Sequence, residues 1–127
     1  MSEIIDHVGI SVNDFGKSHD FYVAALGTLG IKPLVEFEHA GHRHCGFGTD
    51  RPTFWIGDGK TAYPDGHIAF VARSRAEVTA FYTAALAAGG RDNGPPGLRP
   101  HYHANYFGAF VFDPDGHNIE AVCHAAE

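Results

Sequence analysis

The chain has 127 residues, 44% of them hydrophobic and 13% aromatic, which is enough for one compact domain with a sizeable core. Fifteen acidic and nine basic side chains give a formal net charge of −6 without any basic run, which argues against a nucleic-acid partner. No stretch approaches the roughly 18 apolar residues of a membrane span. The start, MSEIIDHVGISV, lacks the features of a signal peptide. We therefore expect a cytoplasmic protein that has no membrane partner.

Two residue types stand out in this composition. The only two cysteines, Cys45 and Cys123, lie far apart in the sequence and are expected to be reduced, packed thiols of a cytosolic protein. Ten histidines are an unusual number for so short a chain. The histidines are therefore the first candidates for functional residues.

The first half of the chain begins with alternating residues that predict a strand over 4–12, with His7 on a mostly small and polar face. Asn13 or Asp14 supplies a helix N-cap, and apolar residues follow at helical spacing until a glycine ends the helix. A turn-rich connector is expected at 57–66. Between the helix and this connector we predict three short strands, at 34–39, 43–48 and 52–56.

The first part of the second half, 67–90, repeats 7–30 of the first half without a gap. A shift of 60 residues superposes His67 on His7, and it superposes the Phe-Tyr pair at 81–82 on the pair at 21–22. The second helix has its own start signal, the capping box that begins at Ser74 and ends at Glu77. Such self-similarity indicates duplicated structural units.

The repeat predicts the fold class and the domain organisation. We expect one α+β domain over 1–127, built from two βαβββ modules that are related by pseudo-twofold symmetry. Module one spans about 1–62 and module two about 63–127. Residues at matching positions of the two modules are then expected to face each other.

The end of the chain carries a loop and a hairpin. Gly94–Gly97 is predicted to be a mobile lid or connector. Asp113-Pro114-Asp115-Gly116 predicts a tight turn between two short apolar strands. In the second of these strands, alternation places Glu120 on one face together with Asn118 and Val122. A carboxylate at this position is unexpected in an apolar strand.

His7, His67 and Glu120 form the candidate metal site. The two histidines occupy matching strand positions, and Glu120 supplies the acid that would complete their set. Two imidazole nitrogens and one carboxylate bind a divalent metal with positions left open, as in 2-His-1-carboxylate iron sites or in Zn and Mn sites. Open positions allow a metal to act on a substrate.

These residues lie in motifs that resemble the vicinal oxygen chelate superfamily, which includes glyoxalase I, extradiol dioxygenases and bleomycin-resistance proteins. The motifs are DHVGISVND, GHIAFVA and DPDGHNIEAV. The resemblance implies two modules that form a cupped mixed sheet around one metal, usually in a homodimer. It also implies that His7, His67 and Glu120 are the metal ligands, on the first, fifth and eighth strands.

One departure from glyoxalase I bears on the reaction. Glyoxalase I has a fourth protein ligand on the last strand of module one, where the nearest residues of this chain are Phe54 and Trp55. Neither can bind a hard cation. A set of three protein ligands is more similar to the sets in dioxygenases and fosfomycin thiol transferases. A fosfomycin thiol transferase would also need cationic residues to bind a phosphonate, whereas Arg99 is the only cation expected near the pocket of this chain.

The remaining histidines and aromatic residues complete the prediction. His103 and Tyr106 are the candidate catalytic residues, and His101 lies beside them in a stretch that forms either a substrate-selecting rim or a turn of exposed polar aromatics. His42 and His44 are interpreted as solvated strand histidines.

The sequence thus predicts a metal-dependent, homodimeric enzyme that chelates neighbouring oxygens of a small substrate. Dioxygenase-type chemistry with Fe(II) is preferred, because three ligands leave three sites for a bidentate substrate and dioxygen. The alternatives are a glyoxalase-like lyase or isomerase with Mn, Ni or Zn, and a metal-free binding protein of the bleomycin-resistance type.

Overall fold

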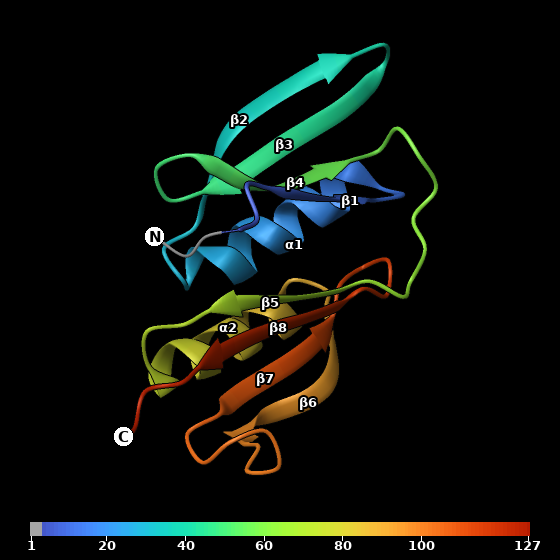
Figure 1. Ribbon diagram of the computed structural model, residues 1–127. Coiled ribbons are helices and arrows are strands. Elements are labelled where there is room, and N and C mark those ends of the chain that lie inside the picture. The colour runs from blue at the N-terminus through green and yellow to red at the C-terminus, as the bar shows by residue number, and fades with distance from the viewer. Residues whose placement is uncertain (1–3) are drawn as a thin grey trace.

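The computed structural model describes residues 4–127. Residues 1–3, which begin both the MSEIIDHVGISV segment and the predicted 1–127 domain, lie outside the described part. Two four-stranded sheets, each with one helix on one face, make up the molecule (Figure 1). The elements in chain order are β1 Val8–Ser11, α1 Phe15–Gly27, β2 Lys32–His39, β3 His42–Gly48, β4 Pro52–Gly57, β5 His67–Val71, α2 Arg75–Ala87, β6 Arg91–Leu98, β7 Phe107–Phe112 and β8 Asn118–Cys123.

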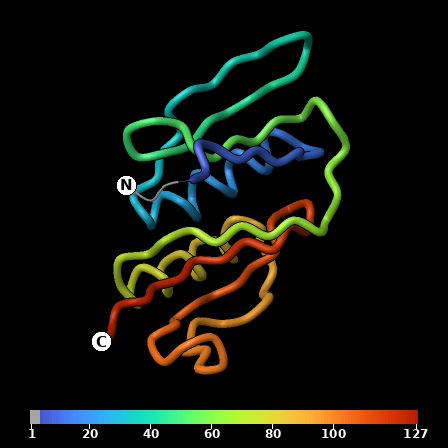
Figure 2. The backbone as a smooth tube through the Cα atoms, in the orientation of Figure 1, coloured from blue at the N-terminus to red at the C-terminus, as the bar shows by residue number. Residues whose placement is uncertain are grey.

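The two modules have the same topology, which confirms the predicted α+β fold of two βαβββ units. The strand orders are β1-β4-β3-β2 and β5-β8-β7-β6, and in each sheet the first and last strands of the module pair in parallel. The helices α1 and α2 begin 60 residues apart. β1 and β5 both lie in the middle of the molecule and run in opposite directions, so β1 starts toward the left of the view and β5 toward the right (Figure 1). The connector between β4 and β5 crosses from one module to the other along one side (Figure 2).

Both helices start at the residues that the sequence indicates. Asp14 is the N-cap of α1 and accepts a hydrogen bond from the Lys17 N–H at 3.1 Å. Ser74 caps α2 in the same way and accepts from the Glu77 N–H at 3.1 Å. The predicted capping box is only half formed, because the Glu77 carboxylate accepts from the Arg73 N–H at 2.8 Å.

The core lies between each sheet and its helix and continues across the module boundary. From α1, Phe21, Tyr22 and Leu26 are fully buried, and Phe81 of α2 is their counterpart. The two helices contact each other, and Phe54 of the first sheet meets Phe70 of the second, edge to face at 5.2 Å. One continuous core therefore joins the two modules.

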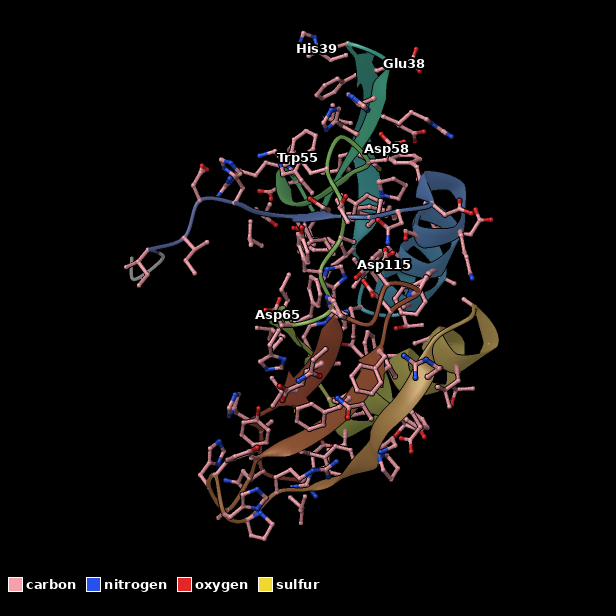
Figure 3. The ribbon with its side chains drawn as sticks, turned by 90° about the vertical axis from the view of Figure 1, so that its right-hand side faces the viewer. Glu38, His39, Trp55, Asp58, Asp65 and Asp115 are labelled. Atoms are coloured by element: carbon pink, nitrogen blue, oxygen red, sulfur yellow. The ribbon has the colours of Figure 1, made fainter. Side chains whose placement is uncertain are left out.

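A buried polar network also joins the modules, at the tight turn between β7 and β8. The Tyr22 hydroxyl of module one donates to Asp113 Oδ2 at 2.5 Å, and His117 Nδ1 lies 2.7 Å from the same oxygen. Asp115 accepts a hydrogen bond from the Asn13 N–H at 3.2 Å, and it lies beside α1 in Figure 3. The predicted turn is thus confirmed, and it interlocks the two modules.

The ionisation of this network follows from its contacts. Burial alone would raise the pKa of Asp113, but the hydrogen bonds from His117 and Tyr22 outweigh it and hold that pKa below its usual value. The hydrogen bond to Asp113 raises the pKa of His117. Burial, together with the negative charge of Asp113, raises the pKa of Tyr22, which therefore remains a hydrogen-bond donor.

Three further predictions have clear outcomes. The prediction of a loop at Gly94–Gly97 is wrong, because this segment lies within β6. An edge strand tolerates its prolines, since only one side of the backbone pairs, and register shifts interrupt the ladder there. Cys45 and Cys123 are free and buried, as expected. Within residues 4–127 no helix is long and apolar enough to cross a membrane.

Candidate metal centre and pocket

The sheet faces that carry no helix hold the candidate site residues. In the parallel ladder of β5 and β8, His67 pairs with Asn118 and Ala69 pairs with Glu120. Paired residues project from the same face, so His67 and Glu120 point the same way from adjacent strands. The His67 Nε2 atom lies 3.1 Å from Glu120 Oε1. The structure therefore brings together two of the three predicted ligands.

The donor set of this pair fits a divalent metal. His67 Nδ1 lies 3.1 Å from the Asn118 carbonyl oxygen, so Nδ1 carries the proton and Nε2 is left to face the carboxylate. Histidines that bind metals are oriented by this kind of hydrogen bond to a backbone carbonyl. Adjacent ligands of one octahedral ion, each about 2.1 Å from it, lie about 3 Å apart, close to the separation found here.

Glu120 is held by its surroundings. It is only 1% exposed, and its second carboxylate oxygen accepts a hydrogen bond from the Tyr106 hydroxyl. Burial, and then the hydrogen bond to Glu120 and its charge, raise the pKa of Tyr106. Tyr106 therefore keeps its proton at neutral pH and acts as a donor to Glu120. Gly108 makes room for this contact, since a Cβ there would lie 3.2 Å from both side chains.

An open pocket of about 670 Å³ adjoins the pair. His103 Nδ1 accepts from the Asn105 N–H at 3.0 Å, so its proton is on Nε2, which faces His124 Nδ1 at 2.5 Å. Arg99 is not among the residues that line the pocket, and its guanidinium donates to the carbonyl oxygens of Pro95 and Gly97. The lining residues are His67, His101, Tyr102, His103, Tyr106, Phe110, Asn118 and Glu120.

His7 lies apart from this pair within one chain. It immediately precedes β1, its side chain is 64% exposed, and its Nδ1 atom lies 3.9 Å from an Asp6 carboxylate oxygen. His7 immediately precedes β1 and His67 begins β5, and these strands start on opposite sides of the view in Figure 1, so the expectation that these two matching residues face each other is wrong within one chain. Within the described residues, His7 belongs to no close three-residue donor group with His67 and Glu120.

The helix-free face of the first sheet forms a second hollow, of about 350 Å³. Trp55 lies on this face, on the side of the sheet opposite to α1, as does His39 (Figure 3). His42 and His44 also line the hollow, and the His44 ring stacks on Phe37 at 5.0 Å. The two strand histidines therefore border a cavity with an aromatic wall.

Sequence reasoning missed two clusters of metal-binding side chains. Asp113, Asp115 and His117 form one, but the hydrogen bonds of the network between the modules already satisfy Asp113. The other comprises His19, Glu36 and Cys45. Their positions 19, 36 and 45 share no motif, so only the pairing of β2 with β3 and the packing of α1 reveal this group.

Comparison with known proteins identifies the fold. The family model of the Glyoxalase/Bleomycin resistance protein/Dioxygenase superfamily matches residues 4–121. A glyoxalase/bleomycin resistance protein from Albidiferax ferrireducens T118 is 32% identical, with a TM-score of 0.81, over 97% of this chain and 100% of that chain. The comparison with curated proteins gives no match.

A more distant structure shares the fold alone. Glyoxalase I from Zea mays is 18% identical with a TM-score of 0.72, and this chain spans 45% of that chain. The family match and the similarity to the Albidiferax protein both extend over nearly the whole sequence. The chain belongs to the Glyoxalase/Bleomycin resistance protein/Dioxygenase superfamily.

Proposed function

We propose that the chain is a metal-dependent enzyme in which His67 and Glu120 are two ligands of a divalent metal ion. The observation that carries the proposal is the approach of His67 Nε2 to Glu120 Oε1, at 3.1 Å, while His67 Nδ1 is committed to a carbonyl oxygen. The pair opens onto a pocket of about 670 Å³, a volume that suits a small organic substrate.

The third ligand, His7, would come from a second copy of the chain. A two-fold dimer that packs module one of each chain against module two of the other would bring the partner subunit's His7 to His67 and Glu120. Such a dimer would form two equal sites. It would also cover large apolar side chains of the helix-free faces, among them Phe37 and Val71, which are 47% and 77% exposed.

Dioxygenase-type chemistry with Fe(II) is the reaction we favour. Such an ion would chelate two neighbouring substrate oxygens and stabilise the charge that develops on them. Three protein ligands leave room for a bidentate substrate and dioxygen. Tyr106 would hold Glu120 in position, and His103, on the pocket wall, would hold a proton at Nε2 that it shares with His124 Nδ1.

Two alternatives follow from the family. A glyoxalase-like lyase or isomerase with Ni, Zn or Mn is the first, supported by the fold shared with glyoxalase I. Trp55 argues against it, because an indole occupies the position of the extra carboxylate. A metal-free binding protein is the second, and the approach of the buried Glu120 carboxylate to His67 Nε2, at the separation of adjacent metal ligands, argues against it. A cytoplasmic setting suits the two free cysteines.

The test uses two variants in one heterodimer. His7→Ala and Glu120→Ala chains are co-expressed with different tags, purified through both tags, and loaded anaerobically with Fe(II). If sites are shared between subunits, one of the two sites is intact, so iron binding returns to about half of the wild-type level. Neither variant alone should bind iron at these sites.

The outcomes separate the possible arrangements. No iron in the heterodimer, with iron in the wild type, would contradict a site shared between chains. Iron retained by both single variants would overturn the ligand assignment. Wild-type protein that binds none of Fe(II), Mn(II), Ni(II) or Zn(II) would leave the metal-free binding protein. Oxygen uptake with catechol as a probe diol then tests the reaction class.

A further inference from the structure

A second group of metal-binding side chains lies on the opposite face of the first sheet, beneath α1. Glu36 of β2 and Cys45 of β3 are a directly opposed cross-strand pair. His19 of α1 approaches the pair from the helix. One ligand atom from each of the three residues lies within 4.8 Å of the other two. The group combines an imidazole, a carboxylate and a thiol.

The His19 imidazole is oriented toward this group. Its ring stacks on Phe15 at 5.7 Å and lies 6.2 Å from the Phe47 ring, so aromatic side chains on two elements limit its rotation. Nδ1 faces an Asp20 carboxylate oxygen at 3.8 Å, beyond hydrogen-bond distance, so Nε2 is the nitrogen that points into the group.

The other nitrogen of His19 is an orphaned buried atom. Nε2 is inaccessible to solvent and has no hydrogen-bond partner among residues 4–127. Glu36 Oε2 lies 3.2 Å away, but the geometry of this approach does not make a hydrogen bond. A buried nitrogen that faces a carboxylate without a hydrogen bond is unfavourable unless a cation lies between them.

Cys45 completes the donor set from the core side. Its side chain is fully buried and unpaired with the other cysteine. Burial, and the nearby charge of Glu36, raise the pKa of the Cys45 thiol to about 11, so without a metal the thiol keeps its proton. Metal coordination deprotonates a thiol outright. One thiolate and one carboxylate would neutralise the charge of a divalent cation.

We propose that His19, Glu36 and Cys45 form a second metal site, which binds a Zn(II)-class cation and ties α1 to the β2–β3 hairpin. Sulfur and nitrogen donors favour this class over Mg(II) or Ca(II). Glu36, which is half-exposed, gives an entry path and room for water as a fourth ligand. Arg43 lies 3.8 Å from the other Glu36 oxygen and orients the carboxylate.

This site is independent of the proposed active site. It lies on the helix-covered face of module one, whereas His67 and Glu120 lie on the helix-free face of module two. The chain also supplies a matched control for the thiol, because Cys123 is equally buried but lies outside the group.

Co(II) is the probe, since a cobalt–thiolate bond has a charge-transfer band in the near ultraviolet that oxygen and nitrogen ligands do not give. Full-length protein is titrated with Co(II) under reducing, anaerobic conditions. We expect the band in wild type, Cys123→Ser and Glu120→Gln, and its loss in Cys45→Ser. Asp20→Asn, at an exposed carboxylate that makes no hydrogen bond to His19, should retain the band. Zn(II) should displace cobalt and abolish the band.

The outcomes that overturn the proposal are equally specific. The absence of a band in folded wild-type protein at saturating Co(II) would exclude the site, and a band that survives Cys45→Ser but not Cys123→Ser would move it. Cys45 is buried in the core, so Cys45→Ser can disturb folding as well as metal binding. Glu36→Gln, at a half-exposed position, is therefore a second test variant. An unchanged cobalt affinity of Glu36→Gln would also contradict the proposal. Loss of the band in Glu120→Gln would contradict the independence of this site from the proposed active site, which contains no thiol.

Discussion

Trp55 in the first sheet stands at the position that Glu120 occupies in the second. Gly9 pairs with Trp55 and Ala69 pairs with Glu120, and Gly9 and Ala69 are equivalent in the repeat. Gly46 makes room for the indole, because a Cβ there would lie 2.8 Å from two of its ring carbons. One module therefore presents an aromatic wall where the other presents a buried carboxylate.

Replacing Trp55 by Glu is expected to add a fourth protein ligand to the proposed active site. Trp55 shares its sheet face with Gly9, the face on which His7 is expected, so the new carboxylate would lie beside the metal in the shared site. We expect metal affinity to rise about tenfold, equivalent to about 1.4 kcal/mol, and oxygen uptake to fall because an open position is filled. Trp55→Gln, which lacks the charge, is the control in a chelator competition assay. An equal rise in affinity for both variants would contradict this interpretation.

Tyr106→Phe tests the support of Glu120. Removing the hydroxyl leaves one carboxylate oxygen without its donor, which should destabilise the fold by about 1–3 kcal/mol. It should also weaken metal binding about 10-fold to 100-fold, as the loss of other groups that orient ligands does. Urea unfolding and metal titration measure the two effects. Tyr102→Phe, at an exposed residue of the same pocket, should change neither.

The Asp113–His117 pair predicts a stability that depends on pH. The pKa of His117 is raised by folding, so its contribution is complete below its unfolded value of about 6.5 and is lost as pH rises through the folded value. The pKa of Asp113 is lowered, so its contribution is present above about pH 3.9 and is lost as pH falls through the folded value. The pair should therefore stabilise most between about pH 4 and 6.5.

His117→Gln isolates this contribution from that of the other histidines. The free energy of unfolding, measured by urea titration from pH 5 to 8.5, should decline less with pH in the variant than in wild type. At pH 5.5 the variant should be less stable by about 1.5–3 kcal/mol, the range for a hydrogen bond to a charged group. His101→Gln, at an exposed position, should follow the wild-type curve. Parallel curves for wild type and His117→Gln would refute the prediction.

Gly46→Ala should destabilise the protein through crowding. The added Cβ would lie 2.7 Å from the Pro52 Cβ and 2.8 Å from the Trp55 ring, and overpacking of this kind costs about 1–3 kcal/mol. In a Trp55→Leu background the cost should be smaller, because only the proline contact remains. Thermal unfolding of the four proteins gives the coupling. Gly27→Ala, where the new methyl group meets nothing within 4 Å, should not destabilise the protein.

Most of the fold could be predicted from the sequence because local signals and the repeat agreed. The Asp14 and Ser74 caps start the helices where expected, and alternation identified β8 with Glu120 on one face. The Gly94–Gly97 segment could not be predicted, because proline and glycine indicate a loop locally and only the edge position of β6 permits a strand.

The site was predictable in part for a similar reason. His67 and Glu120 come together because β5 and β8 are adjacent, which follows from the module topology. The sequence could not determine that β1 and β5 run in opposite directions, and this arrangement separates His7 from the other two. The contact between Tyr106 and Glu120 depends on the path of a loop that no periodicity describes.

β2 and β6 are the outer edge strands of the two sheets, and they are unequal. The prolines of β6 lack backbone donors and its ladder is interrupted, so it is a poor template for another strand. β2 has one proline and one register shift near its start, but from Val35 to His39 it pairs regularly with β3 and carries exposed Val35 and Phe37. Glu36 and Glu38 beside them repel like chains. Aggregation under conditions that neutralise these carboxylates should therefore begin at β2.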